Sequence, residues 1–303
     1  MTPRVPFLHV EDLELLSAGA LGQGLPPGPL SIKAFGTLVA VGVYLGAFLA
    51  LRQGRRSGLP RHVLGAFVLW VFIGGFAGGH VLGTLMYEPE RAWRDPCTLL
   101  MLWDGQSSFG GFAGAVLAAL LFRSRYRMPW LPYAEAVASA FPVGWLFGRC
   151  GCALAHDHPG QPSSAWFAVL YPDGGRFDLG LYEMVLTLPL AAVFLVLRRR
   201  PQPLGLYLTC LTLTYAPMRL ALDFLRARHT SGPQVPVVDA RYGPLTPAQW
   251  GCLGLLGAGC WLFGRLARTI DGPEWQRIRG TRALLRPLGP EAAIGPTRTD
   301  VPP

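Results

Sequence analysis

Long apolar runs alternate with short polar stretches along most of the chain. A helix that crosses the hydrocarbon core of a bilayer needs ~20 mainly apolar residues, and each run is near that length. Glycine and proline interrupt several runs, which spanning helices tolerate because neighbouring helices satisfy the freed backbone groups. The pattern therefore predicts an all-α, polytopic membrane protein with about seven transmembrane helices, near residues 34–51, 63–86, 109–122, 134–153, 181–197, 204–225 and 248–266.

The composition agrees with a membrane protein. Of the 303 residues, 51% are hydrophobic and 15% are charged, and the mean hydropathy is +0.32. Soluble domains carry about 25% charged residues. The net charge of +9 could indicate a nucleic-acid partner, but the arginines form short clusters between the apolar runs. Membrane topology explains that distribution better, so we expect no nucleic-acid binding.

The arginine clusters also predict how the helices are oriented. They follow the first, third, fifth and seventh runs, whereas the other loops mix arginine with aspartate and glutamate. By the positive-inside rule the N-terminus lies outside and the C-terminus in the cytoplasm. We expect an extracytoplasmic segment at residues 1–30, a seven-helix membrane domain at 31–268 and a basic, partly disordered cytoplasmic tail at 269–303. The N-terminus lacks the pattern of a cleaved signal peptide.

Two arginines stand inside predicted spans, where an ionisable side chain costs roughly 2.5–3.5 kcal/mol and indicates a function by default. Arg219 is followed by Asp223 and Arg226, four and seven residues on, so the three should share one helix face. Either Arg219 and Asp223 form a self-sufficient pair, or the two arginines bind an anion such as phosphate. Arg149, the other arginine, either snorkels to the membrane interface or points into the same site.

Further polar groups are predicted near the outer ends of the spans. His80 lies in a glycine-rich helix and is either a packing residue or a functional one. Glu183 is either an acid favoured at a helix N-terminus or part of a site. His156 and His158 flank Asp157 just after the fourth run. The six cysteines include no CxxC pair and no zinc-like spacing, so we expect neither a metal nor a cofactor.

Several phrases, taken in order, are similar to those of one membrane enzyme family. GRCGCALAHDHPG at 148–160 resembles the signature GR-x-GN-F-x-N-x-E-x-x-G, with Cys152 at the asparagine and Asp157 at the glutamate. FGG at 109–111 resembles an HGG phrase, and LYE at 181–183 is intact. YAPMRLALDFLR at 215–226 resembles YG-x-x-R-F-x-x-E-F-x-R, and LTPAQ at 245–249 resembles LT-x-x-Q. Over residues 28–250 the chain thus resembles the phosphatidylglycerol–prolipoprotein diacylglyceryl transferase family, as a divergent member with Phe109 replacing a histidine and Phe35 replacing a tyrosine.

The resemblance implies an activity, its substrates and its location. The family transfers the diacylglyceryl group of phosphatidylglycerol to the lipobox cysteine thiol of a prolipoprotein, the first step of bacterial lipoprotein maturation. The implied partners are therefore phosphatidylglycerol, the prelipoprotein signal peptide and the lipid bilayer. The implied location is the bacterial cytoplasmic (inner) membrane, as a multi-pass protein. A member that binds phospholipid without transfer and a small-solute transporter are the alternatives, the latter disfavoured because we find no internal repeat.

The implied chemistry assigns roles to the polar residues. The lipid phosphate must be held, and the acceptor must react as a thiolate, for which histidine is a suitable base. We expect both requirements to be met in a catalytic cavity near the outer face. The expected catalytic residues are His80, Arg149, His156, Asp157, His158 and Arg219. The expected substrate-binding residues are Phe109, Gly110, Gly111, Gly160, Tyr182, Glu183 and Arg226.

Overall fold

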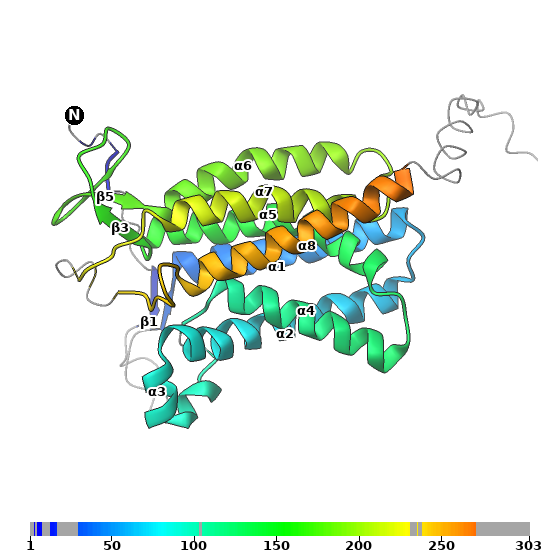
Figure 1. Ribbon diagram of the computed structural model, residues 1–303, viewed down its shortest axis with the longest axis horizontal. Coiled ribbons are helices and arrows are strands. Elements are labelled where there is room, and N and C mark those ends of the chain that lie inside the picture. The colour runs from blue at the N-terminus through cyan, green and yellow to red at the C-terminus, as the bar shows by residue number, and fades with distance from the viewer. Residues whose placement is uncertain are drawn as a thin grey trace, which may run out of the picture.

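Long helices run side by side in the computed structural model, and the short strands gather at one end of the bundle (Figure 1). The structure describes residues 3, 5–7, 13–16, 30–102, 105–230, 235 and 238–270. Each predicted span corresponds to one long helix, with bounds that differ by a few residues. These helices are α1 (Ala34–Arg56), α2 (Arg61–Tyr87), α4 (Ser108–Tyr126), α5 (Leu131–Ala155), α6 (Leu179–Leu197), α7 (Leu206–Asp223) and α8 (Pro247–Ile270).

Five of these helices are long and apolar enough to cross a membrane by length and composition, considering only the described residues. They are α1, α2, α5, α6 and α8. The other two long helices, α4 and α7, are less apolar. Helix α4 ends with Arg123 and Arg125, and α7 carries Arg219 and Asp223. The chain is therefore a mostly helical, multi-pass membrane protein.

At two helix crossings, glycines on both helices let the backbones approach each other closely. A Cβ atom at Gly78 of α2 would lie 2.6 Å from the Cα atom of Gly114 in α4. A Cβ atom at Gly42 of α1 would likewise lie 2.5 Å from the backbone oxygen of Gly144 in α5. Small residues at such crossings allow backbone contact, which drives helix association in a bilayer. The glycines of the α2–α4 crossing, and those of the α1–α5 crossing, are thus explained by packing.

One end of the bundle carries elements that the prediction of an all-α fold missed. Strands β3 (Pro159–Pro162), β4 (Val169–Tyr171) and β5 (Gly174–Asp178) form an antiparallel sheet in the order β3-β5-β4. A second pair joins β1 (Leu13–Leu16) to β2 (Leu30–Ile32). The short helices α3 (Pro89–Arg94) and η1 (Pro96–Leu100) lie at the same end (Figure 1). Strands of three to five residues are too short to leave a periodic signal in the sequence.

The arginine-rich links lie at the opposite end. The α1–α2, α4–α5 and α6–α7 connections and the C-terminus of α8 meet there (Figure 1). Arg198 is buried at this end, where its guanidinium donates to the Ser139 hydroxyl at 2.8 Å and the Leu49 carbonyl at 2.6 Å. The prediction of separate terminal segments concerns residues that lie mostly outside the described part of the chain, and α8 itself continues to Ile270.

Candidate active site

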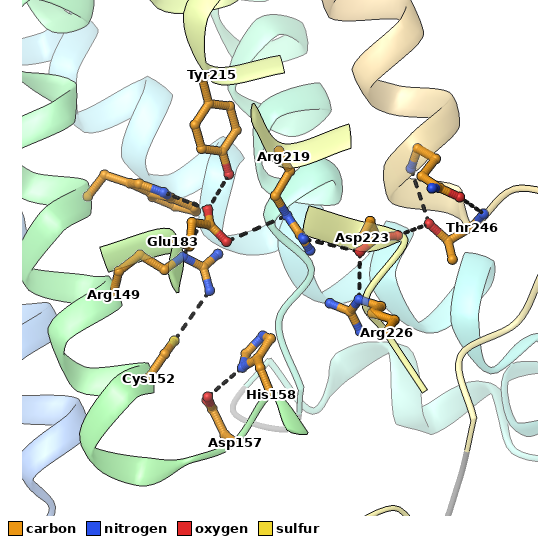
Figure 2. A network of polar contacts seen from close by, with 12 residues as sticks. Arg149, Cys152, Asp157, His158, Glu183, Tyr215, Arg219, Asp223, Arg226 and Thr246 are labelled. Atoms are coloured by element: carbon orange, nitrogen blue, oxygen red, sulfur yellow. Dashed lines mark hydrogen bonds and ion pairs between the residues drawn. The ribbon is translucent and has the colours of Figure 1, made fainter. Parts of the chain in front are cut away.

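A buried carboxylate on α6 joins three helices. Glu183 is only 1% exposed. Its Oε1 atom lies 3.1 Å from Nε of Arg149 on α5 and accepts hydrogen bonds from the hydroxyl of Tyr215 on α7, at 2.7 Å, and from Nε1 of Trp145, at 3.1 Å. The Arg149 guanidinium also stacks over the Trp145 ring, 4.6 Å from its centre. The four groups that contact Glu183 either donate a hydrogen bond to it or carry positive charge, which suits a carboxylate (Figure 2).

A chain of alternating charges continues from Glu183 along α7. Nε of Arg219 lies 3.6 Å from Oε2 of Glu183, and its Nη1 lies 3.1 Å from Oδ1 of Asp223. The same Asp223 oxygen accepts from Nε of Arg226 at 2.6 Å. Because α7 ends at Asp223, Arg226 belongs to the segment after the helix, which corrects the prediction that all three share one helix face.

The outer part of this network uses residues that are distant in sequence. Asp223 accepts a hydrogen bond from the Thr246 hydroxyl, and Arg226 pairs with Asp239. Thr246 precedes α8 and exchanges two hydrogen bonds with Gln249 of that helix. The Gln249 backbone N–H donates to the Thr246 hydroxyl at 3.2 Å, and the Thr246 backbone N–H donates to Oε1 of Gln249 at 3.0 Å. The loop before α8 is thereby tied to the end of α7.

The network contains three guanidinium groups and three carboxylates, so its formal charges cancel. Burying ionised groups is costly even when they are paired, and such sites commonly serve a function. Two nitrogens of Arg219, Nε and Nη1, are buried and find no hydrogen-bond acceptor of good geometry among the described residues. Arg219 therefore contacts two carboxylates by charge and still has donors for an oxygen-rich ligand.

His158 and Asp157 lie beside the network, after the C-terminus of α5. The Nδ1 atom of His158 contacts a carboxylate oxygen of Asp157, and both side chains are partly exposed. In Figure 2 the imidazole and the guanidinium groups of Arg149 and Arg226 gather around one region. An imidazole ring, a carboxylate and several guanidinium groups thus share one end of the helix bundle.

The same corner includes the thiol of Cys152. Ligand atoms of Cys152, Asp157 and His158 lie within 4.8 Å of one another, so these residues could hold a metal ion by type and distance. However, Nη1 of Arg149 lies 3.4 Å from the Cys152 sulfur. This positive charge opposes a second cation at the same place. The arrangement suits an anion better than a metal.

His156 is placed differently from its neighbour His158. It takes a left-handed backbone conformation, with a φ of 50°, at the end of α5. Its Nδ1 atom lies 2.5 Å from Oδ2 of Asp178, which also accepts from the Tyr171 hydroxyl at 3.0 Å. Burial, followed by the nearby Asp178 charge, raises the pKa of Tyr171 above its usual range. The structure therefore places His156 in a contact that joins the small sheet to the end of α5.

His80 and Tyr182 also lie outside the ion network. The His80 ring, 2% exposed, has Nε2 at 2.8 Å from the Thr98 carbonyl and Nδ1 at 3.2 Å from the Gly105 carbonyl. It connects α2 to η1 and to the loop before α4. The Tyr182 hydroxyl donates to the Phe167 carbonyl at 2.8 Å. Both side chains anchor loops at the site end of the bundle.

Phe109, Gly110 and Gly111 are packing residues in this structure. Phe109 is buried in an apolar cluster with Ala216 and Cys252. Gly110 and Gly111 belong to the α2–α4 crossing, where a Cβ atom at Gly110 would lie 2.5 Å from the Gly78 oxygen.

Gly160 brings strand β3 against the segment that carries Arg226. A Cβ atom at Gly160 would lie 2.6 Å from the Leu225 carbonyl oxygen. Gln161 extends this contact. Its backbone N–H donates to the Leu225 carbonyl at 2.9 Å, and its side-chain Nε2 donates to the Arg226 carbonyl at 2.9 Å. The glycine is required because only a residue without a side chain allows this approach of two backbones.

Sequence reasoning left five network residues out of the expected site. Trp145 and Tyr215 lie four residues before Arg149 and Arg219, one helical turn away, and this spacing could have identified them. Asp223 was considered only as a partner of Arg219, although its spacing from Arg219 and Arg226 placed it between the two arginines. No comparable signal was available for Asp239 and Thr246, because their contacts join segments that are distant in the sequence.

The fold and site define a polytopic helical membrane protein with a buried, charge-balanced network of arginines and carboxylates. The profile of the prolipoprotein diacylglyceryl transferase family matches residues 25–265. The chain therefore belongs to that family, which confirms the resemblance inferred from the sequence.

Relatives named phosphatidylglycerol–prolipoprotein diacylglyceryl transferase match most of the chain. The protein of Nitratidesulfovibrio vulgaris (strain Miyazaki F) is 30% identical over 253 residues, which are 81% of this chain and 94% of the relative. That of Chromohalobacter salexigens is 30% identical over 204 residues, 66% of this chain and 76% of the relative. That of Nitrosomonas europaea is 27% identical over 255 residues, 82% of this chain and 90% of the relative.

Proposed function

We propose that this protein transfers the diacylglyceryl group of phosphatidylglycerol to the lipobox cysteine thiol of prolipoproteins, the first step of lipoprotein maturation. Its family and its named relatives support this reaction. The observation that carries the proposal is the buried network in which Arg149, Glu183 and Arg219 come together from three helices. Its two substrates are a membrane phospholipid and the signal peptide of a prelipoprotein.

The arginines bind the phosphate of phosphatidylglycerol. In the reaction, the acceptor sulfur attacks the glycerol carbon that bears the phosphate ester, a C–S bond forms, and the C–O bond breaks. The electron pair of that bond leaves with glycerol phosphate, so negative charge grows on the phosphate oxygens. Arg219 offers two buried nitrogens whose contacts with Glu183 and Asp223 are ion pairs without good hydrogen-bond geometry, and Arg149 and Arg226 face the same region (Figure 2). Preorganised donors at the site of developing charge are the largest single source of rate enhancement in many enzymes.

His158 takes the proton of the acceptor thiol. A thiol is mostly protonated near neutral pH, and the thiolate is the nucleophile. The contact of Nδ1 with Asp157 favours the tautomer in which Nε2 is the unprotonated nitrogen that accepts the proton. Phe109 replaces the family histidine and has no ionisable group, so this pair supplies the base in its place. Asp157 is a positioning residue.

The membrane topology follows from the seven long helices and their arginine clusters. All seven cross the membrane, including α4 and α7, with the N-terminus outside and the C-terminus in the cytoplasm. The clustered arginines at the α1–α2, α4–α5 and α6–α7 connections support this orientation under the positive-inside rule. The network end of the membrane domain, residues 31–268, then faces the outside of the bacterial cytoplasmic membrane, where prolipoproteins emerge.

A transfer assay tests the proposal. In phosphatidylglycerol vesicles, the purified chain should add the mass of a diacylglyceryl group to a peptide that contains a lipobox cysteine. In phosphatidylcholine vesicles, the mass of the peptide should not change. Arg219→Gln should lower the rate about 10²–10³-fold, as loss of a charge-stabilising donor does. His158→Ala should lower it about 10²–10⁴-fold, as loss of a general base does. Arg94→Gln is the control, because Arg94 is exposed at the same end and pairs with Glu90 at the surface.

Two outcomes would refute parts of this proposal. Retention of phosphatidylglycerol without any mass addition by a folded protein would identify a lipid-binding relative that has lost the reaction. Full activity of Arg219→Gln would remove the phosphate role of this network.

A further inference from the structure

A large cavity lies at the end of the bundle opposite the ion network. Its volume is about 1360 Å³, and it is lined by the end of α4, the α4–α5 connection, the residues just before α7 and the last turns of α8. None of the residues proposed for catalysis lines it. Because the cavity is separated from the network by the length of the bundle, it requires its own explanation (Figure 1).

The polar lining of the cavity is strongly basic. Arg123 and Arg127 come from the end of α4, and Arg265 and Arg268 come from α8. The described lining residues include no aspartate and no glutamate. The four guanidinium groups therefore favour an anion, and their forked donors match phosphate oxygens.

The remaining walls of the cavity are apolar and aromatic. Trp130 and Trp261 line it together with leucine side chains such as Leu131 and Leu262. The Arg265 guanidinium lies over the Trp261 ring, 5.0 Å from its centre. Tryptophan is enriched where a membrane protein meets the headgroup layer, and basic pockets between spanning helices bind anionic lipid headgroups.

Membrane topology alone does not explain this combination. The positive-inside rule requires arginines in the loops, but it does not require a cavity with apolar walls between two helices. A free phosphate ion would use the arginines and leave the apolar walls unfilled. A phospholipid with a negatively charged headgroup satisfies both, since its phosphate meets the arginines and the start of its acyl chains meets the leucine and tryptophan side chains.

We propose that this cavity binds the headgroup of an anionic phospholipid in the leaflet opposite the catalytic network. The bound lipid fills the space between α4 and α8, which both line the cavity. This site is separate from the phospholipid site proposed for catalysis, and it requires only that the helices span a bilayer.

Photo-crosslinking tests the site and distinguishes it from the catalytic network. The full-length protein is reconstituted in phosphatidylcholine vesicles with a small fraction of a photoactivatable phosphatidylglycerol, and the adducts are mapped by mass spectrometry. We expect adducts on residues 123–131 and 261–268. The fourfold variant R123Q/R127Q/R265Q/R268Q should lose these adducts at least tenfold, because each basic residue near an anionic surface contributes about fivefold to affinity. The control variant R52Q/R55Q/R199Q/R200Q removes four arginines at the same end that do not line the cavity. It should keep the adducts on residues 123–131 and 261–268.

Further arms decide between the alternatives. Adducts near Arg149 and Arg219 report the catalytic site and serve as a folding control for the fourfold variant. If that variant loses these adducts as well, Arg127→Gln alone is measured, and it should still reduce labelling at the cavity several-fold. Equal loss in both fourfold variants would overturn the proposal in favour of general surface charge. Equal labelling by a photoactivatable phosphatidylcholine, or abolition of labelling by millimolar inorganic phosphate, would also overturn it.

Discussion

Replacing Glu183 by glutamine removes one charge from the centre of the ion network and almost no volume. The carboxylate is 1% exposed and lies 3.1 Å from Arg149 and 3.6 Å from Arg219. The amide can still accept from Tyr215, but the network changes from three carboxylates to two, against three guanidinium groups. Breaking a buried ion pair on one side costs about 3–5 kcal/mol, because the remaining charge stays buried without compensation. We expect the free energy of unfolding of Glu183→Gln to fall by about 3 kcal/mol.

Unfolding by SDS titration in mixed micelles measures this loss. Glu90→Gln is the matched control: Glu90 forms an ion pair with Arg94 at 3.3 Å, but both side chains are 82% exposed. Exposed pairs contribute about 0–1 kcal/mol, so the control should remain close to the wild type. Equal stability of Glu183→Gln and the wild type would show that Glu183 does not balance the two arginines. The inference that a charge-balanced network holds α5, α6 and α7 together would then be wrong.

Other substitutions probe packing, the sheet contact and the thiol. Gly78→Ala should destabilise the protein by about 1–3 kcal/mol, because the added Cβ atom would lie 2.6 Å from the Gly114 Cα atom in α4. Gly65→Ala in the same helix is the control, because its Cβ atom would have no neighbour within 4 Å and should not destabilise the protein. Thermal unfolding compares the two variants. Asp178→Asn should cost about 1–3 kcal/mol by weakening the contact with His156, again measured by thermal unfolding, and an unchanged midpoint would contradict that contact. Cys152→Ala should keep transfer activity within about twofold, because the thiol only lines the site; complete loss of activity would instead give the thiol a chemical role.

The helices were predictable because their signal is local. An apolar run of about 20 residues reports a spanning helix without knowledge of its neighbours, and the seven predicted segments agree with the long helices of the described chain. Arg149 and Arg219 were also predictable, since an ionisable group inside such a run is conspicuous. The intact LYE phrase added Glu183, whose role depends on contacts with two other helices.

The remaining features depend on contacts that no local pattern encodes. His156 and His158 look alike in the sequence, but the left-handed conformation of His156 directs its ring to Asp178, while His158 contacts Asp157 beside the network. The pairing of Arg226 with Asp239 joins a helix end to a distant loop. The short strands pair across loops and have no periodicity of their own.

The cancelling charges of the network have a consequence for turnover. Under the proposed function, a phosphodiester that enters this site meets guanidinium groups already paired with carboxylates, so its binding is an exchange of partners and not the occupation of a vacant positive pocket. The affinity for lipid is then a small difference between two sets of ion pairs. When glycerol phosphate departs, Glu183 and Asp223 recover their arginines, and this return favours release of the product. This competition between the carboxylates and the phosphate for the arginines suits an enzyme that binds an abundant membrane lipid and then releases its anionic fragment.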